Sequence, residues 1–268
     1  MDSKKIKEIS KATIICSIRD FSLKSLKKKP KFQILDLIIP KERKIRSIVG
    51  GLETSLGTTL WEPLAKALAL ENGFKVREAD LEAPINMPSS LNNTLQTIID
   101  DRKRGYGRHD AYSSHQEIKA ICQSFIKRPI EGFEKAPRGK GVDIWLIKDE
   151  VNYFFDTKTV QPNIQTLGGC LEQILYWYAY FYSQNPLGQA QSRIVFPYNP
   201  SPETSFWSGV MNRGKPLEPG NEAWVEDEFW DFCSGYSGTY RIIEEAFKEI
   251  RESGELESTL SDLLNNHD

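Results

Sequence analysis

Residues 141–163 read GVDIWLIKDEVNYFFDTKTVQPN, and this stretch decides the fold. Residues 144–147 and 151–155 are two short apolar runs, the second rich in aromatic side chains, and a charged tip separates them. Two such runs across a polar tip predict a β-hairpin. Because the apolar side chains need a core, we expect this hairpin to belong to a buried sheet.

Three charged side chains converge at the open end of the predicted hairpin. Asp143 precedes the first strand and Asp156 ends its antiparallel partner, while Lys158 lies two residues beyond and points to the same face. Neighbouring carboxylates repel unless they share a proton or a cation, and Mg²⁺ is held by one or two carboxylates with phosphate oxygens and water. A bound metal activates water, and an ammonium stabilises developing charge. The three groups therefore suit metal-assisted hydrolysis of a phosphodiester.

The spacing D-x₁₂-D-x-K also allows a plainer interpretation. Asp143 and Lys158 can be solvated residues at the ends of a surface hairpin, because a loosely spaced pattern of this kind occurs by chance in chains of this length. The apolar residues beside both aspartates favour a site instead, since charged groups next to buried strand positions are usually paired or bound to metal.

Composition limits the class of protein. The 268 residues are 39% hydrophobic and 27% charged, with a net charge of -2, which is typical of a globular protein without a global basic field. The four cysteines are far apart and have no zinc spacing, so we expect free thiols in a reducing cytosol. The polar N-terminus and the lack of a long apolar run predict a soluble, cytoplasmic protein with no membrane partner.

Hydrophobic periodicity predicts a single domain over 1–268 with helices around the hairpin. We expect an N-terminal helical region over 1–40, a catalytic core over 41–215 and C-terminal helices over 216–268. Helices are predicted at residues 4–28, 41–56, 114–127, 171–183, 224–232 and 239–264. Another helix is predicted to begin at a capping box formed by Thr59 and Glu62 and to end at Leu70. Strands are predicted at 74–79 and 192–198.

Basic and amide side chains that can contact nucleic acid fall mainly in loops. Residues 100–112, DDRKRGYGRHDAY, predict a flexible loop whose arginines suit phosphates and guanine edges, although neighbouring aspartates can neutralise it as an ordinary solvated loop. The connector before Asp143, the polar loop after Lys158 and the long loop at 199–222 supply further candidates. The candidate DNA contacts are Arg102, Lys103, Arg104, Arg108, Arg138, Lys140, Gln161, Asn163, Arg213 and Lys215.

Three segments carry a resemblance to a known family. SLGTTLWEPLA (55–65), KGVDIWL (140–146) and FDTKTVQPN (155–163), followed by an aromatic helix, resemble the TdeIII-type family of type II restriction endonucleases. The D-x₁₂-D-x-K pattern also resembles the PD-(D/E)xK nuclease signature, with Val142 where that signature often has proline. The resemblance implies a restriction-endonuclease-like α/β fold, with a central mixed sheet flanked by helices and extra N- and C-terminal helices.

The same resemblance implies Mg²⁺-dependent cleavage of double-stranded DNA at a short palindrome, with GGNCC the expected site, leaving 5′-phosphate and 3′-hydroxyl ends. It also implies a homodimer and a paired DNA methyltransferase. Asp143, Asp156 and the carbonyl of Thr157 would hold the metal, and Lys158 would position or deprotonate the attacking water. Glu53 or Glu62 would hold a second metal or a water. The plainer interpretation is a solvated helix face for Glu53 and a helix cap for Glu62.

Two alternatives stay open at this point. A structure-specific PD-(D/E)xK repair or junction nuclease would use the same catalytic residues but would read DNA shape. A non-catalytic DNA-binding or interaction protein would keep the hairpin without the chemistry, in which case substitution of Asp143 would change no DNA-linked activity.

Overall fold

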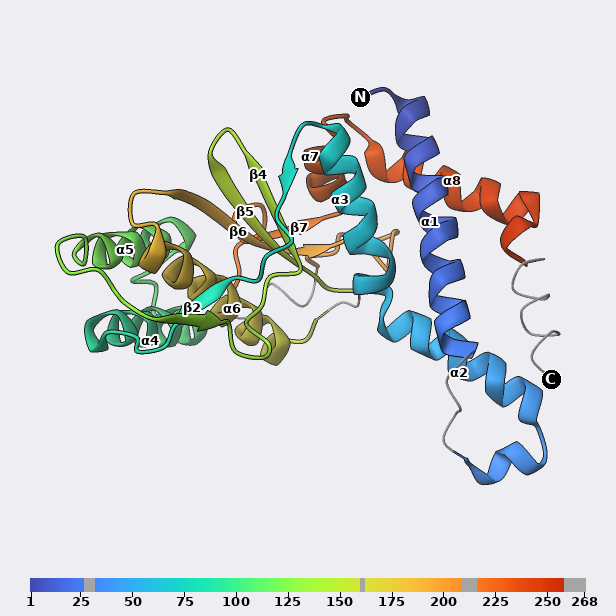
Figure 1. The fold of residues 1–268 in the computed structure, drawn as a ribbon, viewed down its shortest axis with the longest axis horizontal. Helices are drawn as coiled ribbons and strands as arrows, with labels where there is room; N and C mark the ends of the chain where they lie inside the picture. The colour runs from blue at the N-terminus through green and yellow to red at the C-terminus, as the bar shows by residue number, and fades with distance from the viewer. Residues whose placement is uncertain (27–31, 160–161, 209–215, 258–268) are drawn as a thin grey trace. The chain divides into compact units, whose positions relative to one another are not determined.

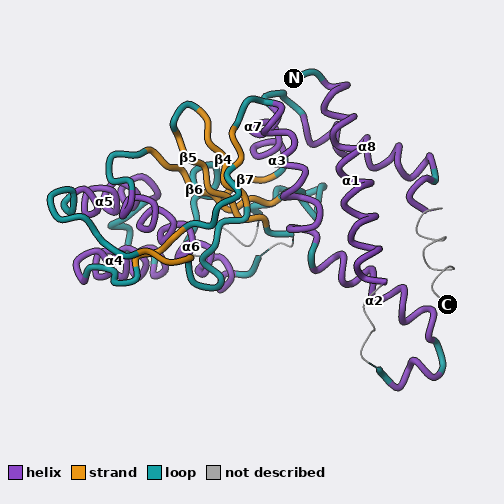
Figure 2. Tube along the Cα trace, in the orientation of Figure 1, coloured by secondary structure: helices purple, strands orange, loops and turns teal. Residues whose placement is uncertain are grey.

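The computed structural model describes residues 1–26, 32–159, 162–208 and 216–257. Figure 1 shows the course of the chain, and Figure 2 shows its helices and strands. The chain divides into two units, one built from residues 1–72 and 230–268 and the other from residues 73–229. The boundaries expected at residues 40 and 215 stay a prediction.

A five-stranded mixed sheet forms the centre of the 73–229 unit, in the order β1-β4-β5-β6-β7. The pairs β1–β4 and β4–β5 are antiparallel, whereas β5–β6 and β6–β7 are parallel. The strand bounds are β1 Lys75–Val76, β4 Ile144–Lys148, β5 Val151–Thr157, β6 Gln189–Phe196 and β7 Ala223–Val225. The predicted mixed α/β class with a central mixed sheet is therefore confirmed.

The β4–β5 hairpin forms as the sequence predicts. Ile144 is paired with Phe155, and Lys148 with Val151, so that the two apolar runs face each other. Asp149 and Glu150 close the turn with φ values of 50° and 64°, a left-handed conformation that aspartate tolerates better than most residues. A second sheet of two strands, β2 (Glu82–Pro84) and β3 (Phe133–Lys135), lies in the same unit.

Helix α6 (Ile164–Gln184) makes the crossover between the parallel strands β5 and β6. Together with α4 (Ser89–Arg104) and α5 (Ala111–Gln123), it packs on one face of the sheet (Figure 1). Phe154 of β5 contacts the rings of Trp177 and Phe181 on that face. The next residue, Phe155, contacts Trp224 and Phe229 instead, because successive strand residues point to opposite faces.

The other unit is helical. It contains α1 (Ser3–Leu26), η1 (Ile34–Leu37), α2 (Pro40–Thr54), a π-helical turn at Gly57–Trp61, α3 (Glu62–Glu71) and α8 (Thr239–Ser253), while α7 (Asp227–Ser234) crosses the boundary between the units. Ile6 and Ile14 of α1 are fully buried, and Trp61 packs against Trp230 and Phe247. The helices expected at 4–28 and 41–56 are thus confirmed to within two residues at each end.

Several local expectations are wrong, and each fails where packing overrides a local signal. No capping box starts α3 at Thr59, because the π-helical turn continues into α3 and the Thr59 hydroxyl donates to Ser55 Oγ at 3.0 Å. Helix α4 runs through residues 100–104, where a loop is predicted. Helix α6 begins at Ile164, seven residues earlier than predicted, and β7 occupies the start of the helix predicted at 224–232.

Within the described residues, no helix is both long enough and apolar enough to cross a membrane.

Candidate active site

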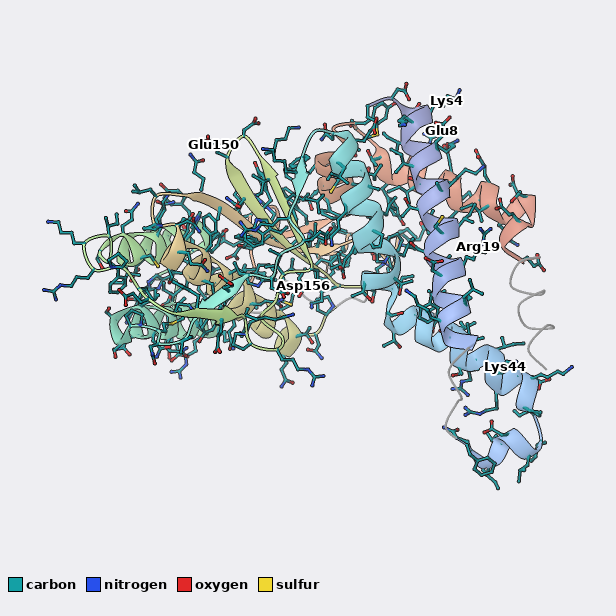
Figure 3. All side chains as sticks on the ribbon, in the orientation of Figure 1. Lys4, Glu8, Arg19, Lys44, Glu150 and Asp156 are labelled. Atoms are coloured by element: carbon teal, nitrogen blue, oxygen red, sulfur yellow. The ribbon has the colours of Figure 1, made fainter. Side chains whose placement is uncertain are left out.

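The strand register brings the two predicted carboxylates together. The β4–β5 pairing, continued by one residue beyond Ile144 and Phe155, places Asp143 opposite Asp156. The backbone N–H of Asp143 donates to the Phe155 carbonyl at 3.1 Å, and Asp143 Oδ2 accepts the Thr157 N–H at 3.2 Å. Figure 3 labels Asp156 at this end of the hairpin and Glu150 at the opposite tip. Asp156 is buried, with 4% of its surface exposed.

Lys158 completes the group that the sequence predicts. Its N–H donates to the Val195 carbonyl at 2.9 Å, which extends the β5–β6 pairing and holds the residue in an extended conformation. Its Nζ lies 2.6 Å from Asp156 Oδ2. Burial alone would lower the pKa of Lys158, but the charge and hydrogen bond of Asp156 outweigh it and raise the pKa above its usual value. Lys158 is therefore an ammonium at neutral pH.

The donor set at this end of β5 suits a hard divalent cation. Asp143 and Asp156 supply carboxylate oxygens, and the Thr157 backbone supplies a carbonyl, all of which are ligand types that Mg²⁺ prefers. In the described part of the chain, no three or more His, Cys, Asp or Glu side chains gather closely enough to hold a metal. A cation here would therefore complete its shell with water and phosphate oxygens, as Mg²⁺ commonly does.

Two side chains of α6 hold the backbone that leads into Asp143. Trp177 Nε1 lies 2.9 Å from the Lys140 carbonyl and 3.2 Å from the Gly141 carbonyl, and it donates to both. Gln173 Nε2, one helical turn earlier, donates to the same Gly141 carbonyl at 3.2 Å. Sequence reasoning assigned the aromatic face of α6 to the core alone and missed this contact. The one available signal is a glutamine on an otherwise apolar helix face.

Two of the candidate DNA-contacting lysines share one carboxylate. Lys103 at the end of α4 forms an ion pair with Glu172 Oε1, and Lys140 Nζ lies 3.4 Å from Glu172 Oε2. The Lys140 ammonium also lies 4.5 Å from the centre of the Tyr176 ring. Burial would raise the pKa of Glu172, but the two lysines outweigh it and lower that pKa. The two lysines, which are far apart in sequence, thus meet on the surface of α6.

Arg102 is not on a flexible loop, and this expectation is wrong. It lies in α4 and is buried, with 6% of its surface exposed. Its guanidinium bonds both carboxylate oxygens of Glu222, at 3.0 and 2.5 Å, and also donates to the Pro216 carbonyl and Ser114 Oγ. Such a pair holds α4 against the segment before β7, so we assign Arg102 a structural role.

With this geometry in place, sequence comparison decides the family. The family described as "Type II restriction endonuclease, HinfI" matches residues 2–251. The chain belongs to this family. The expectation of a type II restriction endonuclease family is confirmed, and the narrower TdeIII-type assignment stays a prediction.

One curated relative extends the comparison for this HinfI family member. The protein named "Type II restriction enzyme MjaII", from Methanocaldococcus jannaschii, is 25% identical over 209 residues, which are 75% of this chain and 53% of the relative. The chain therefore spans about half the length of the curated relative it matches. No solved structure matches the chain.

The remaining basic candidates of this HinfI family member differ in exposure. Arg104, Arg108 and Arg138 are exposed, and Arg104 donates to the Tyr106 hydroxyl at 3.2 Å. Asn163 caps α6, because its Oδ1 accepts the Thr166 N–H at 2.8 Å. The candidates Gln161, Arg213 and Lys215 lie outside the described residues.

The two additional acids lie in the helical unit. Glu53 is exposed near the end of α2, and Glu62 is the first residue of α3. Both belong to the 1–72 part of the chain, whereas Asp143 and Asp156 belong to the 73–229 unit. A role for Glu53 or Glu62 beside the two aspartates therefore stays a prediction.

Proposed function

We propose that this chain is a type II restriction endonuclease that hydrolyses phosphodiester bonds of double-stranded DNA at Asp143, Asp156 and Lys158. The convergence of these three side chains at the end of β5 carries the proposal, within a chain whose family is that of type II restriction endonucleases. The order of hairpin, crossover helix α6 and parallel strand β6 supports the PD-(D/E)xK fold as the finer class.

Each residue has a defined task in this proposal. Asp143, Asp156 and the Thr157 carbonyl would hold Mg²⁺, which would stabilise charge on the phosphoryl group and make a bound water more acidic. The Lys158 ammonium, held on the same face as Asp156, donates a hydrogen bond to the attacking water or to a phosphate oxygen. Attack in line with the leaving oxygen gives a 5′-phosphate and a 3′-hydroxyl.

Substrate DNA is proposed to run past the connector that precedes Asp143. Exposed Arg138 lies in this connector, and Lys140 follows two residues later. Glu172, which binds Lys103 and Lys140, occupies the place that a phosphate of the bound duplex would take between the two ammonium groups. Arg104 and Arg108 are further contact candidates because both are exposed.

A homodimer is proposed because a palindromic target has two-fold symmetry. An exposed apolar segment in the helical unit supports it. Phe32, Ile34, Leu37 and Ile38 around η1 are each about 70% exposed, and such contiguous apolar surface is typical of interaction sites. Light scattering of Ile38→Asp against the wild-type chain checks this surface: a monomer from the variant and a dimer from the wild type are expected.

The recognition sequence is proposed to be a short palindrome. The resemblance to the TdeIII-type family implies that this site is GGNCC. A paired DNA methyltransferase would protect host DNA at that site. Sequencing the ends of the cleavage products tests both the site and the 5′-phosphate. A recurring sequence other than GGNCC would overturn the TdeIII-type expectation alone.

The deciding experiment is cleavage of unmethylated plasmid with Mg²⁺ or with EDTA. Wild-type protein is compared with Asp156→Asn, which keeps the shape of the side chain, and with Glu150→Gln, which removes an exposed acid from the tip of the same hairpin. We expect discrete Mg²⁺-dependent bands from the wild type and Glu150→Gln, and none from Asp156→Asn.

Other outcomes identify the alternatives. Cleavage confined to junctions or other irregular DNA would indicate a structure-specific nuclease. Cleavage by Asp156→Asn at the wild-type rate, or no cleavage by the folded wild-type chain on any DNA, would contradict the proposal.

A further inference from the structure

A second recess lies in the sheet unit, along the outer edge of β6. It is a hollow of about 470 Å³ beside the N-terminal half of β6, and its walls include His115, Lys119, Val151 and Arg193. Val151 begins β5, whereas Asp156 lies five residues further along the same strand. Arg193 lies opposite Phe155 in the β5–β6 pairing, next to Asp156, but successive strand residues point to opposite faces, so Arg193 and Asp156 lie on different faces of the sheet.

The recess exists because β6 has no neighbouring strand there. Strand β7 pairs only with residues 194–196, which leaves the outer edge of Gln189–Arg193 without a strand partner in the described residues. Two tyrosines of α6 accept hydrogen bonds from the backbone N–H groups of this edge instead. The Ala190 N–H donates to the Tyr182 hydroxyl at 3.2 Å, and the Ser192 N–H donates to the Tyr178 hydroxyl at 2.9 Å. These bonds block addition of another strand and leave a hollow for a small group.

Two cations of the recess have no acidic partner. Arg193 and Lys119 form no ion pair with any carboxylate in the part of the chain that is described. The guanidinium of Arg193 lies 4.0 Å from the centre of the Trp224 ring, and one of its nitrogens donates to Gln191 Oε1 at 2.8 Å. Its Nε is buried and has no acceptor among the described groups. A half-buried cation without a counter-charge is costly, and an anion in the recess would offset that cost.

The acids near these cations are already engaged. Glu222, in the wall of the recess, forms the buried pair with Arg102 and also accepts the Glu218 N–H at 2.9 Å. Glu228 is close enough to interact with Arg193 electrostatically, but its Oε2 accepts the Val225 N–H at 2.9 Å. Because Arg102 balances Glu222, Lys119 and Arg193 give the lining of the recess a net positive charge, which the single carboxylate of Glu228, outside the lining, offsets only in part.

We propose that this recess binds a phosphate-bearing ligand, with Arg193 and Lys119 holding the phosphate. Its volume falls within the range of small-molecule pockets, so it accommodates more than a bare phosphate ion. His115 stacks on the Tyr178 ring at 4.0 Å between centres and offers a planar polar wall for the rest of the ligand. The phosphate can come from a free nucleotide or from a DNA backbone.

The test uses the full chain in EDTA, so that metal at Asp143 and Asp156 does not contribute. Inorganic phosphate, AMP and adenosine are titrated by calorimetry into the wild type, Arg193→Met, Lys119→Met and the control Lys127→Met, which removes an exposed lysine outside the recess. If the source is a nucleotide, AMP binds and adenosine does not. Either recess variant is expected to lower the affinity for AMP at least about tenfold, the size of one charge-assisted contact. The control is expected to bind AMP with wild-type affinity.

A short duplex of random sequence, followed by fluorescence anisotropy, provides the DNA arm. If the source is a DNA backbone, both recess variants weaken duplex binding about tenfold while AMP binds weakly or not at all. Circular dichroism checks folding, and Lys119→Met decides alone if Arg193→Met does not fold. Wild-type affinity of both variants for AMP and duplex, or no binding of either probe by the folded wild type, overturns the proposal. None of these measurements depends on DNA cleavage, so the proposed nuclease function can fail separately.

Discussion

The ammonium of Lys158, the residue that follows β5, lies 2.6 Å from Oδ2 of Asp156, two residues earlier. Asp156 is buried, and a buried carboxylate needs a positive partner. Lys158 supplies that charge, and a Mg²⁺ ion bound by Asp143 and Asp156 would be a second positive partner of the Asp156 carboxylate. If the proposed function holds, Lys158 serves both the stability of the folded chain and the reaction.

Lys158→Met removes this charge, and we expect it to slow plasmid cleavage by at least about 10²-fold, the usual contribution of a catalytic proton-transfer or charge-stabilising group. Single-turnover rates measure the chemical step, and anisotropy measures DNA binding. Lys158→Arg keeps the charge and should lose less than Lys158→Met. Equal, undiminished rates for both variants would exclude Lys158 from the reaction.

Trp177→Phe removes the indole N–H that holds the Lys140 and Gly141 carbonyls. We expect a loss of about 1 kcal/mol in the free energy of unfolding, the typical net contribution of a hydrogen bond, because Gly141 is exposed and its carbonyl keeps the Gln173 donor. Since this backbone leads into Asp143, the cleavage rate should fall while DNA affinity changes little.

A matched control is Trp145→Phe, whose indole N–H donates to Asn152 Oδ1 at 2.9 Å within the hairpin. Urea unfolding and single-turnover cleavage of both variants separate the two effects. Similar stability losses with a rate loss only in Trp177→Phe are expected. Equal rates in the two variants would show that the Trp177 contact is purely structural.

Glu222→Gln leaves the buried guanidinium of Arg102 with only the partly exposed carboxylate of Glu218, at 3.7 Å. Breaking a buried ion pair typically costs about 3–5 kcal/mol, so the urea midpoint should fall steeply. The double variant Arg102→Met, Glu222→Met removes both charges and should recover much of this loss. A Glu222→Gln variant as stable as the wild type would contradict a structural role for the pair.

His115 makes stability depend on pH. Burial, followed by the charges of Lys119 and Arg193, lowers the pKa of His115 from 6.5 to about 4. As pH falls, His115 therefore takes up a proton at a higher pH in the unfolded chain than in the folded chain. The stability present above pH 6.5 is lost as pH falls toward 4, by at most about 1.4 kcal/mol per pH unit.

His115→Gln removes this titration, and its stability should fall less between pH 7 and pH 5 than that of the wild type. Urea unfolding at the two pH values measures the difference, because the other titrating groups are common to both proteins. Equal losses in the two proteins would show that the imidazole titrates normally.

Local sequence determined the elements that depend on neighbouring residues. Two short apolar runs across a polar tip predict the β4–β5 hairpin, and the two-residue turn at Asp149 and Glu150 fixes its register. The meeting of Asp143, Asp156 and Lys158 is a direct consequence of that register, so the sequence alone located the candidate site. Helical periodicity likewise predicts α1, α2 and α5.

Tertiary structure decided which charged side chains are buried in ion pairs. Arg102 looks like its neighbours Lys103 and Arg104 in the sequence, but its partner Glu222 lies 120 residues away, and no local pattern reports that pairing. The same holds for the Trp177 contact with Lys140 and for the recess around Arg193, which exists because β7 stops short along β6. Short-range periodicity encodes a helix or a strand, whereas burial and ion pairing depend on which distant segments the fold packs together.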